Sequence, residues 1–312
     1  MNRAKQFAEL GKFKDFLSDE KKKTLKWQTV CWSGTANNCS ATISYYASTN
    51  PNAYGDIVLF PGLATNTNID PFMKNLIFWG LNHRRNVITI DTFLGEFKDR
   101  LSATEAKQYA DKNTYSEFVS LIEQSIKFIQ PYTIPNKNIL IGHSAGATGL
   151  TDALNNLTIK DIKTNAGSVM LFAPCFGVQQ IGTIDKAVKR RIESNRDKYP
   201  DDVLIMPNAQ DVWETHRLRN VYVSPDFIVD MFKSDFRPDL MNKWGTYITI
   251  VAAQKDTKVS IKCLKQCFEK MENMSCADLF KMITISDSQH SILAPNQNNR
   301  KVLNIIKNQK TK

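Results

Sequence analysis

Short apolar runs rich in β-branched residues recur along the chain, and each is bounded by turn-forming residues. Runs of this kind are typical of strands that are buried on both faces of a parallel sheet. Helix-like segments follow most of them, and this alternation predicts right-handed βαβ crossovers in a doubly wound α/β fold. The predicted strands are residues 57–60, 87–90, 139–141, 169–172, 247–251 and 282–285. The predicted helices are about residues 70–82, 115–129, 145–154, 259–272 and 296–308.

Two regions depart from this alternation. Residues 25–32 and 41–47 are predicted to pair as antiparallel strands ahead of the parallel part. Between Pro174 and Gly245 the chain carries charged helices and several prolines, but no clean buried strand. We therefore expect a core formed by residues 1–174 and 245–312, and a helical cap, residues 175–244, inserted after the strand that ends near Phe172.

The composition is that of a soluble globular protein. The 312 residues are 42% hydrophobic, which is enough for one large core or two modest ones. The first thirty residues carry charges throughout, and no run approaches the roughly 18 apolar residues of a membrane-spanning helix. The sequence therefore predicts neither a secretory signal nor a transmembrane segment, and it favours a cytoplasmic location.

The cysteines and the net charge bear on the expected partners. The six cysteines lack the paired spacing of zinc sites, so no metal is expected. Cys31 and Cys39 flank a turn-like stretch, and they could pair if the protein is exported. The formal net charge of +10 would attract anionic surfaces. No helix-turn-helix, finger or ribonucleoprotein motif accompanies this charge, so a nucleic-acid partner is not expected.

The pentapeptide Gly142-His-Ser-Ala-Gly146 joins a predicted strand to a predicted helix. A serine between two glycines in this strand-turn-helix context is the arrangement that a nucleophile elbow requires. Small residues at 142 and 146 would let neighbouring backbone pass closely. The turn would place the Ser144 hydroxyl near N–H groups at a helix N-terminus, where an oxyanion can be stabilised. The alternative is a serine that merely caps the helix.

A nucleophilic serine needs a base, and the chain contains four histidines. His143 lies inside the turn and should point away from the neighbouring hydroxyl, His83 precedes the second parallel strand, and His216 lies in the insertion. His290 follows the last predicted strand, at the edge where catalytic loops gather in an α/β sheet. It is therefore the predicted base, and a histidine on an ordinary surface loop is the alternative.

The third member of such a site is a carboxylate that orients the base. Asp256 follows the predicted strand 247–251, which gives the chain order serine, aspartate, histidine. Asp287 is the alternative acid, but it lies three residues from His290 on the same loop and would struggle to reach the far imidazole nitrogen.

With these residues in place, the chain resembles the α/β-hydrolases, and within them the lysophospholipase and monoacylglycerol-lipase branch. The shared landmarks are Leu59-Phe-Pro-Gly-Leu63, Gly142-His-Ser-Ala-Gly146, Leu171-Phe-Ala-Pro174, Asp256-Thr-Lys-Val259 and His290. The resemblance implies that Ser144 is the nucleophile, His290 the base and Asp256 its orienting acid. It also implies an oxyanion hole made by the backbone N–H groups of Leu63 and Ala145.

The implied reaction is hydrolysis of a small-molecule carboxylic ester through an acyl-enzyme, without a cofactor. The resemblance points to a lipid ester such as a monoacylglycerol or a lysophospholipid. A peptidase or acyltransferase on the same scaffold, and a non-catalytic binding protein, are the alternatives. The sequence departs from its relatives at Pro61-Gly62, where they usually carry His-Gly, and at Phe93-Leu-Gly95, where they usually carry an Arg-Gly pair.

The predicted cap contains a segment with a basic amphipathic pattern. Residues 184–192 space apolar side chains along one helical stripe, with Lys and Arg mostly off it. The favoured interpretation is a cap helix packed on the body with a solvated basic side. The alternative is a helix that rests on an anionic membrane surface while its apolar face guides acyl chains inward. The apolar patch at 227–232 is interpreted as core packing of the cap. Cys263 and Cys267 are interpreted as buried packing residues.

Overall fold

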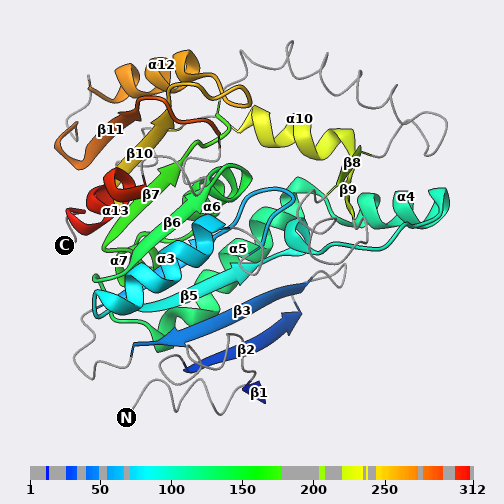
Figure 1. Ribbon diagram of the computed structural model, residues 1–312, viewed down its shortest axis with the longest axis horizontal. Coiled ribbons are helices and arrows are strands. Elements are labelled where there is room, and N and C mark those ends of the chain that lie inside the picture. Colours follow the sequence, from blue (N-terminus) through cyan, green and yellow to red (C-terminus); the bar gives the residue numbers. More distant parts are fainter. Residues whose placement is uncertain are drawn as a thin grey trace.

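The computed structural model describes residues 12–13, 26–33, 40–48, 55–66, 71–176, 204–207, 220–234, 237, 244–272, 277–290 and 299–309. Within these residues a nine-stranded sheet has the order β1-β2-β3-β5-β4-β6-β7-β10-β11 (Figure 1). The strands are β1 (Lys12–Phe13), β2 (Lys26–Ser33), β3 (Ser40–Ala47), β4 (Asp56–Phe60), β5 (Asn86–Asp91), β6 (Ile139–His143), β7 (Ser168–Phe172), β10 (Tyr247–Ala253) and β11 (Phe280–Ile285).

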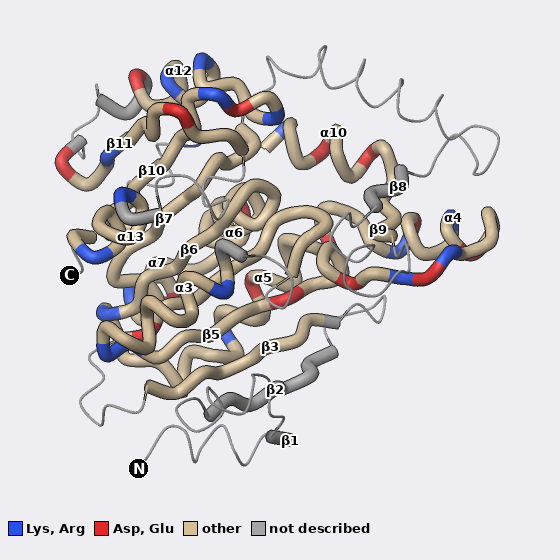
Figure 2. The backbone as a smooth tube through the Cα atoms, in the orientation of Figure 1, with Lys and Arg blue, Asp and Glu red and all other residues tan. Residues whose placement is uncertain are grey.

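The sheet has an antiparallel end and a parallel part. Strands β1, β2, β3 and β5 pair antiparallel in that order, whereas β5, β4, β6, β7, β10 and β11 are all parallel to their neighbours. Each predicted parallel strand is present, and so is the predicted antiparallel pair. Figure 2 shows no charged residue along β6 and β7 at the centre of the sheet. The prediction of a mostly parallel, doubly wound α/β sheet is therefore confirmed.

Helices cover both faces of the sheet. The predicted ones are α3 (Pro71–Asn82), α5 (Tyr115–Ile129), α6 (Ala145–Asn156), α12 (Ile261–Glu272) and α13 (Asn299–Lys307). Strand β4 shows the alternation, since Ile57 and Leu59 pack with residues of α3 and α13, whereas Val58 and Phe60 pack with residues of α5 and α6. None of the described helices is long and apolar enough to span a membrane.

Several described elements lie outside the predicted ranges, among them α4 (Ala103–Lys112), α7 (Ile159–Asn165), and the antiparallel pair β8 (Leu204–Pro207) and β9 (Asn220–Val223). Strand β9 is fully buried, so the expectation that residues 175–244 contain no buried strand is wrong. The reason is a tertiary contact. The backbones of Lys98 and Asn220 exchange hydrogen bonds of 2.9 and 2.8 Å, and the Tyr222 hydroxyl accepts the Leu101 N–H at 3.1 Å.

Helix α10 (Pro225–Lys233) follows β9 and packs against α5. Its Phe227 ring makes edge contacts with Tyr115 and Phe93 at centroid distances of 5.5 and 6.3 Å. The 227–232 patch is therefore buried, as its interpretation as packing requires, but its contacts are with the main core and not with a separate core of the cap. Cys267 is buried as predicted and Cys263 is half-buried. The basic segment 184–192, His216 and the proposed pairing of Cys31 with Cys39 lie outside the residues whose side chains are described.

Candidate active site

Ser144 lies on the sharp turn between β6 and α6, with φ 52° and ψ −122°. A positive φ is strained for a serine, so the surrounding structure must hold this conformation in place. The Ser144 N–H donates to the Phe172 carbonyl at 2.8 Å, and its carbonyl accepts the Ala147 N–H at 3.0 Å. Ser144 occupies the N-cap position of α6 but its side chain makes no capping hydrogen bond, so the hydroxyl serves another partner.

The two glycines of the pentapeptide allow this turn to form. A Cβ atom at position 146 would lie 2.3 Å from the carbonyl oxygens of Phe60 and Pro61, and one at position 142 would lie 2.5 Å from the Ala147 Cα. Only glycine avoids these clashes, as the sequence predicts.

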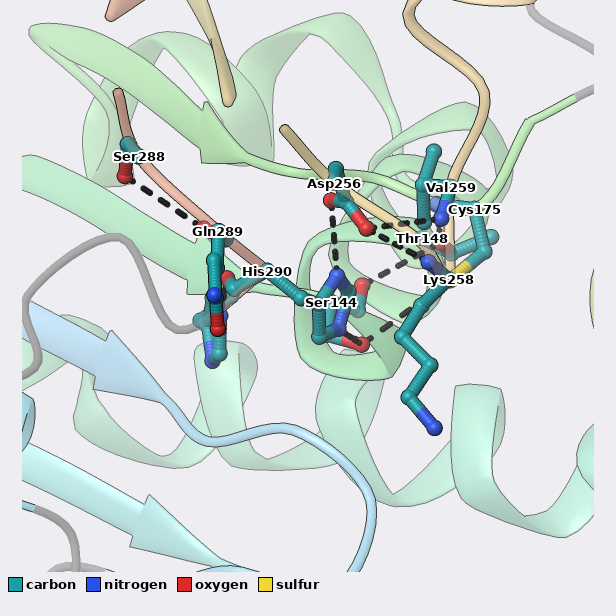
Figure 3. Close-up of polar contacts among 10 residues, drawn as sticks. Ser144, Thr148, Cys175, Asp256, Lys258, Val259, Ser288, Gln289 and His290 are labelled. Atoms are coloured by element: carbon teal, nitrogen blue, oxygen red, sulfur yellow. Dashed lines mark hydrogen bonds and ion pairs between the residues drawn. The ribbon is translucent and has the colours of Figure 1, made fainter. Parts of the chain in front are cut away.

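The Ser144 hydroxyl is hydrogen-bonded to His290, which comes from the segment after β11 (Figure 3). The distance from Ser144 Oγ to His290 Nε2 is 2.8 Å, and the distance from His290 Nδ1 to Asp256 Oδ2 is also 2.8 Å. With the proton on Nδ1, the imidazole donates to Asp256 and accepts the Ser144 O–H. The His290 side chain is 21% exposed and that of Asp256 only 3%. The structure therefore brings the three predicted residues into one hydrogen-bonded chain.

Asp256 is held by its own loop. Its Oδ1 accepts the backbone N–H groups of Lys258 and Val259 at 2.7 and 2.9 Å. Burial alone would raise the pKa of the Asp256 carboxyl. The hydrogen bond and charge of His290, together with the two N–H donors, outweigh burial, so this pKa lies below its ordinary value. Asp256 is therefore a carboxylate in a fixed orientation.

The other titratable candidates point elsewhere. The Asp287 side chain is 74% exposed and forms an ion pair with Lys255 at 2.7 Å, which lowers its pKa. His83 bonds to the Trp79 carbonyl at 2.7 Å and stacks on the Trp79 ring. His143 Nε2 lies 3.1 Å from the His290 carbonyl oxygen, and the imidazole that bonds to the Ser144 hydroxyl is that of His290.

The loop after β4 runs directly beside the nucleophile. A Cβ atom at Gly62 would lie 3.1 Å from the Ser144 Cβ, which is closer than an ordinary van der Waals contact, so the backbone of this loop lies next to Ser144. Leu63 follows in the same loop, and Ala145 is the first residue of α6, where N–H groups have no partner within the helix. The two residues predicted for the oxyanion hole thus stand on segments that border Ser144.

Cys175 is a neighbour of Ser144 that sequence reasoning missed. Its Sγ lies 3.9 Å from the Ser144 Oγ, and its N–H donates to the Thr148 hydroxyl oxygen at 2.8 Å. Burial raises the pKa of the Cys175 thiol to about 12, so it stays protonated at neutral pH. Cys175 follows the end of β7, and position after a parallel strand is the signal that also identified Asp256.

No cluster of three or more metal-ligating side chains occurs within the part of the chain that the structure describes. The described residues do form a pocket beside β5, lined by Thr42, Asn66, Asp91, Thr92, Phe93, Gly95 and Glu96.

The sequence matches no protein-family model and no curated protein sequence. Solved structures are similar in fold. Est1E from Butyrivibrio proteoclasticus superposes with a TM-score of 0.56 at 11% identity, over 89% of this chain and 96% of Est1E. The Pyrococcus furiosus esterase Pf2001 gives 0.58 at 11% identity, over 93% and 92% of the two chains. The α/β-hydrolase GrgF from Penicillium sp. sh18 gives 0.54 at 12% identity, over 89% and 95%. The chain therefore has the α/β-hydrolase fold.

Proposed function

We propose that the protein is a serine hydrolase that cleaves carboxylic esters. The observation that carries this proposal is the position of His290, whose two ring nitrogens lie 2.8 Å from the Ser144 hydroxyl and 2.8 Å from the Asp256 carboxylate. A serine at its ordinary pKa is a weak nucleophile, and a base oriented by a third group is the arrangement that activates it.

In the proposed reaction the Ser144 oxygen attacks the acyl carbonyl while His290 Nε2 takes the hydroxyl proton. The N–H groups of Leu63 and Ala145 stabilise the oxyanion of the tetrahedral intermediate. His290 then returns the proton to the leaving alcohol, and the acyl group remains on Ser144. Water, deprotonated by the same nitrogen, attacks the acyl-enzyme and releases the acid. Asp256 stays ionised throughout and stabilises the imidazolium.

The finer proposal is that the ester is a lipid ester, such as a monoacylglycerol or a lysophospholipid, and it rests on the sequence resemblance. Feruloyl esters should be included in the same test, because a solved structure of Est1E holds ferulic acid, an aromatic acid. Contact of a basic cap helix with an anionic membrane is part of the lipid proposal. A panel of lipid esters, short p-nitrophenyl esters and feruloyl esters, ranked by kcat/KM, would distinguish these classes.

The decisive experiment is labelling with a fluorophosphonate probe. We expect the wild-type protein to be labelled, and Ser144→Ala to remain unlabelled and to lose about 10⁶-fold in kcat, as other triad serines do. The same panel with peptide amides and thioesters separates an esterase from a peptidase or an acyltransferase. If the wild type is labelled no better than Ser144→Ala, the protein is a non-catalytic member of this fold and the proposal is wrong.

A further inference from the structure

The loop that begins with Pro61-Gly62 contacts Phe93-Leu-Gly95, the second segment in which the sequence departs from the hydrolases it resembles. Residues 61–66, here called the oxyanion loop, follow β4, and the short helix η1 (Phe93–Gly95) begins two residues after the neighbouring strand β5. The Ala64 N–H donates to the Leu94 carbonyl at 2.9 Å. The Asn66 side-chain amide donates to the Gly95 carbonyl at 2.7 Å. Two hydrogen bonds therefore connect η1 to the loop.

The fit between the two segments is close. A Cβ atom at position 95 would lie 2.4 Å from the Thr65 carbonyl oxygen, so only glycine lets the segments approach this far. Ala64 has a φ of 55°, which is an unfavourable conformation for alanine. A loop that contains such a residue needs contacts from outside to keep its shape.

η1 is itself firmly anchored. Phe93 and Leu94 are buried, and the Phe93 ring packs on Phe118 at a centroid distance of 6.1 Å. The Thr92 hydroxyl accepts the Leu94 N–H at 3.4 Å, and the Thr92 carbonyl accepts the Gly95 N–H at 2.9 Å. A turn that is packed in the core and capped at its start can act as a fixed support for a strained neighbour.

We propose that η1 positions the oxyanion loop, with the Asn66 amide and the Gly95 backbone as the positioning groups. This inference rests on the proposed function, because it assigns the support to the loop that carries Leu63. A Cβ atom at Gly62 would lie 3.1 Å from the Ser144 Cβ, so the loop has little room to move towards the serine. Displacement of a reacting group by about 1 Å can cost about 100-fold in rate, so a support of this kind matters for catalysis.

Asn66 can be replaced without damage to the core. Its side chain is half-buried, and together with Gly95 it borders the pocket beside β5, which has a volume of about 180 Å³. Thr42 lines the same pocket from β3 and provides a matched control. Removal of either side chain enlarges an existing space instead of opening a new cavity in the core.

For Asn66→Ala we expect kcat to fall about 10- to 100-fold on the best ester, with KM changed by less than about threefold, because oxyanion contacts form in the transition state. Thr42→Ala should keep the wild-type kcat. The inhibition constant of a boronic acid, which forms a tetrahedral adduct on the serine, should rise in parallel with the loss of kcat/KM. Thermal unfolding of both variants checks that each is folded.

Asn66→Asp adds a pH signature. A carboxylate at this position cannot donate to the Gly95 carbonyl, but its protonated form can, so the kcat ratio of variant to wild type should rise as the pH falls. The charged groups that line the pocket are Asp91 and Glu96, and Glu96 is paired with Lys98 at 2.6 Å. Their negative charge favours the protonated form of the introduced carboxyl.

A readout that needs no activity separates this inference from the proposed function. Hydrogen–deuterium exchange at the Ala64 N–H should be faster in Asn66→Ala than in wild type or Thr42→Ala. If exchange is faster but the protein has no Ser144-dependent activity, the inference that η1 positions the loop stands and the proposed hydrolase function is wrong. Unchanged exchange, or an unchanged kcat in an active Asn66→Ala enzyme, would contradict the inference that η1 positions the loop. An equal loss of kcat in Thr42→Ala would contradict it as well.

Discussion

The sheet edge that holds Ser144, Asp256 and His290 differs from the region of α4, β9 and α10 in the contacts that build it. Each residue of the first group follows the end of a parallel strand by one to five positions. Because these strands run in the same direction, all three residues lie at their carboxyl ends. The second region depends on contacts between segments far apart in the sequence, and side-chain hydrogen bonds are prominent among them. The Tyr222 hydroxyl meets residues near 100, and the Ser234 hydroxyl donates to Asp152 at 2.8 Å.

This difference separates two kinds of effect. Changes at the sheet edge should alter the proposed reaction and leave the free energy of unfolding nearly unchanged, because the strands are held by backbone pairing and burial. Changes in the region of α4, β9 and α10 should do the opposite. The comparison would be wrong if a single substitution changed both kcat/KM and the free energy of unfolding.

The largest effect is expected at Asp256. Asp256→Asn should lower kcat/KM by about 10⁴-fold, because the amide no longer fixes the reactive imidazole tautomer. Asp287→Asn is the matched control, since that carboxylate lies on the His290 loop but is exposed and paired with Lys255. It should change kcat/KM by less than about threefold. Steady-state kinetics on one ester tests both, and equal losses would mean that the wrong acid has been assigned.

The parallel sheet was predictable because its strands are buried on both faces and therefore consist almost entirely of apolar residues. The strand ends were not, as Asp56 shows. This residue is polar and lies before the predicted strand 57–60, yet it is buried in β4. Its carboxylate accepts the Asn86 side-chain amide at 2.9 Å and the Ile134 N–H at 3.0 Å. Such compensation becomes visible only when the partners are in place.

Helix α4 and the contact between η1 and the oxyanion loop were missed for different reasons. The start of α4 has a local signal, since Ser102 and Glu105 form a capping box, and a search for this spacing would have found it. The bond from Asn66 to Gly95 has no such signal, because it depends on two loops meeting after neighbouring strands. The three residues of the proposed site were predictable because each follows a recognisable strand.

A smaller effect is expected at Asp152, where α10 meets α6. The Asp152 carboxylate accepts the Tyr115 and Ser234 hydroxyls at 2.6 and 2.8 Å, yet burial raises its pKa above the ordinary value. Because the folded state holds the proton more tightly, the carboxyl stabilises the fold below its unfolded pKa. This contribution is lost as the pH rises through the folded pKa. Asp152→Asn, which does not titrate, should therefore be most destabilised in acid, by about 1–3 kcal/mol.

Urea unfolding at a series of pH values measures this difference. The gap in unfolding free energy between wild type and Asp152→Asn should narrow as the pH rises above the ordinary aspartate pKa of about 4. At neutral pH, kcat/KM should stay within about threefold of wild type. Ser234→Ala is the control that keeps the titrating carboxyl. It should lose about 1 kcal/mol and still show a pH dependence, shifted to higher pH because the Ser234 hydrogen bond lowers the Asp152 pKa. A gap that does not vary with pH would mean that the carboxyl titrates normally.

The smallest effect is expected for Tyr222→Phe in β9. The variant keeps the buried ring but loses the hydroxyl, which accepts the Leu101 N–H at 3.1 Å and donates to the Asp99 carbonyl at 3.4 Å. The longer of these bonds is weak, so the loss should be about 1 kcal/mol in the free energy of unfolding. Hydrogen exchange should show faster opening of α4 and an unchanged rate in β6 and β7. If kcat/KM also fell more than about threefold, the segment from 98 to 112 would be coupled to the sheet edge, and the two regions would be one functional unit.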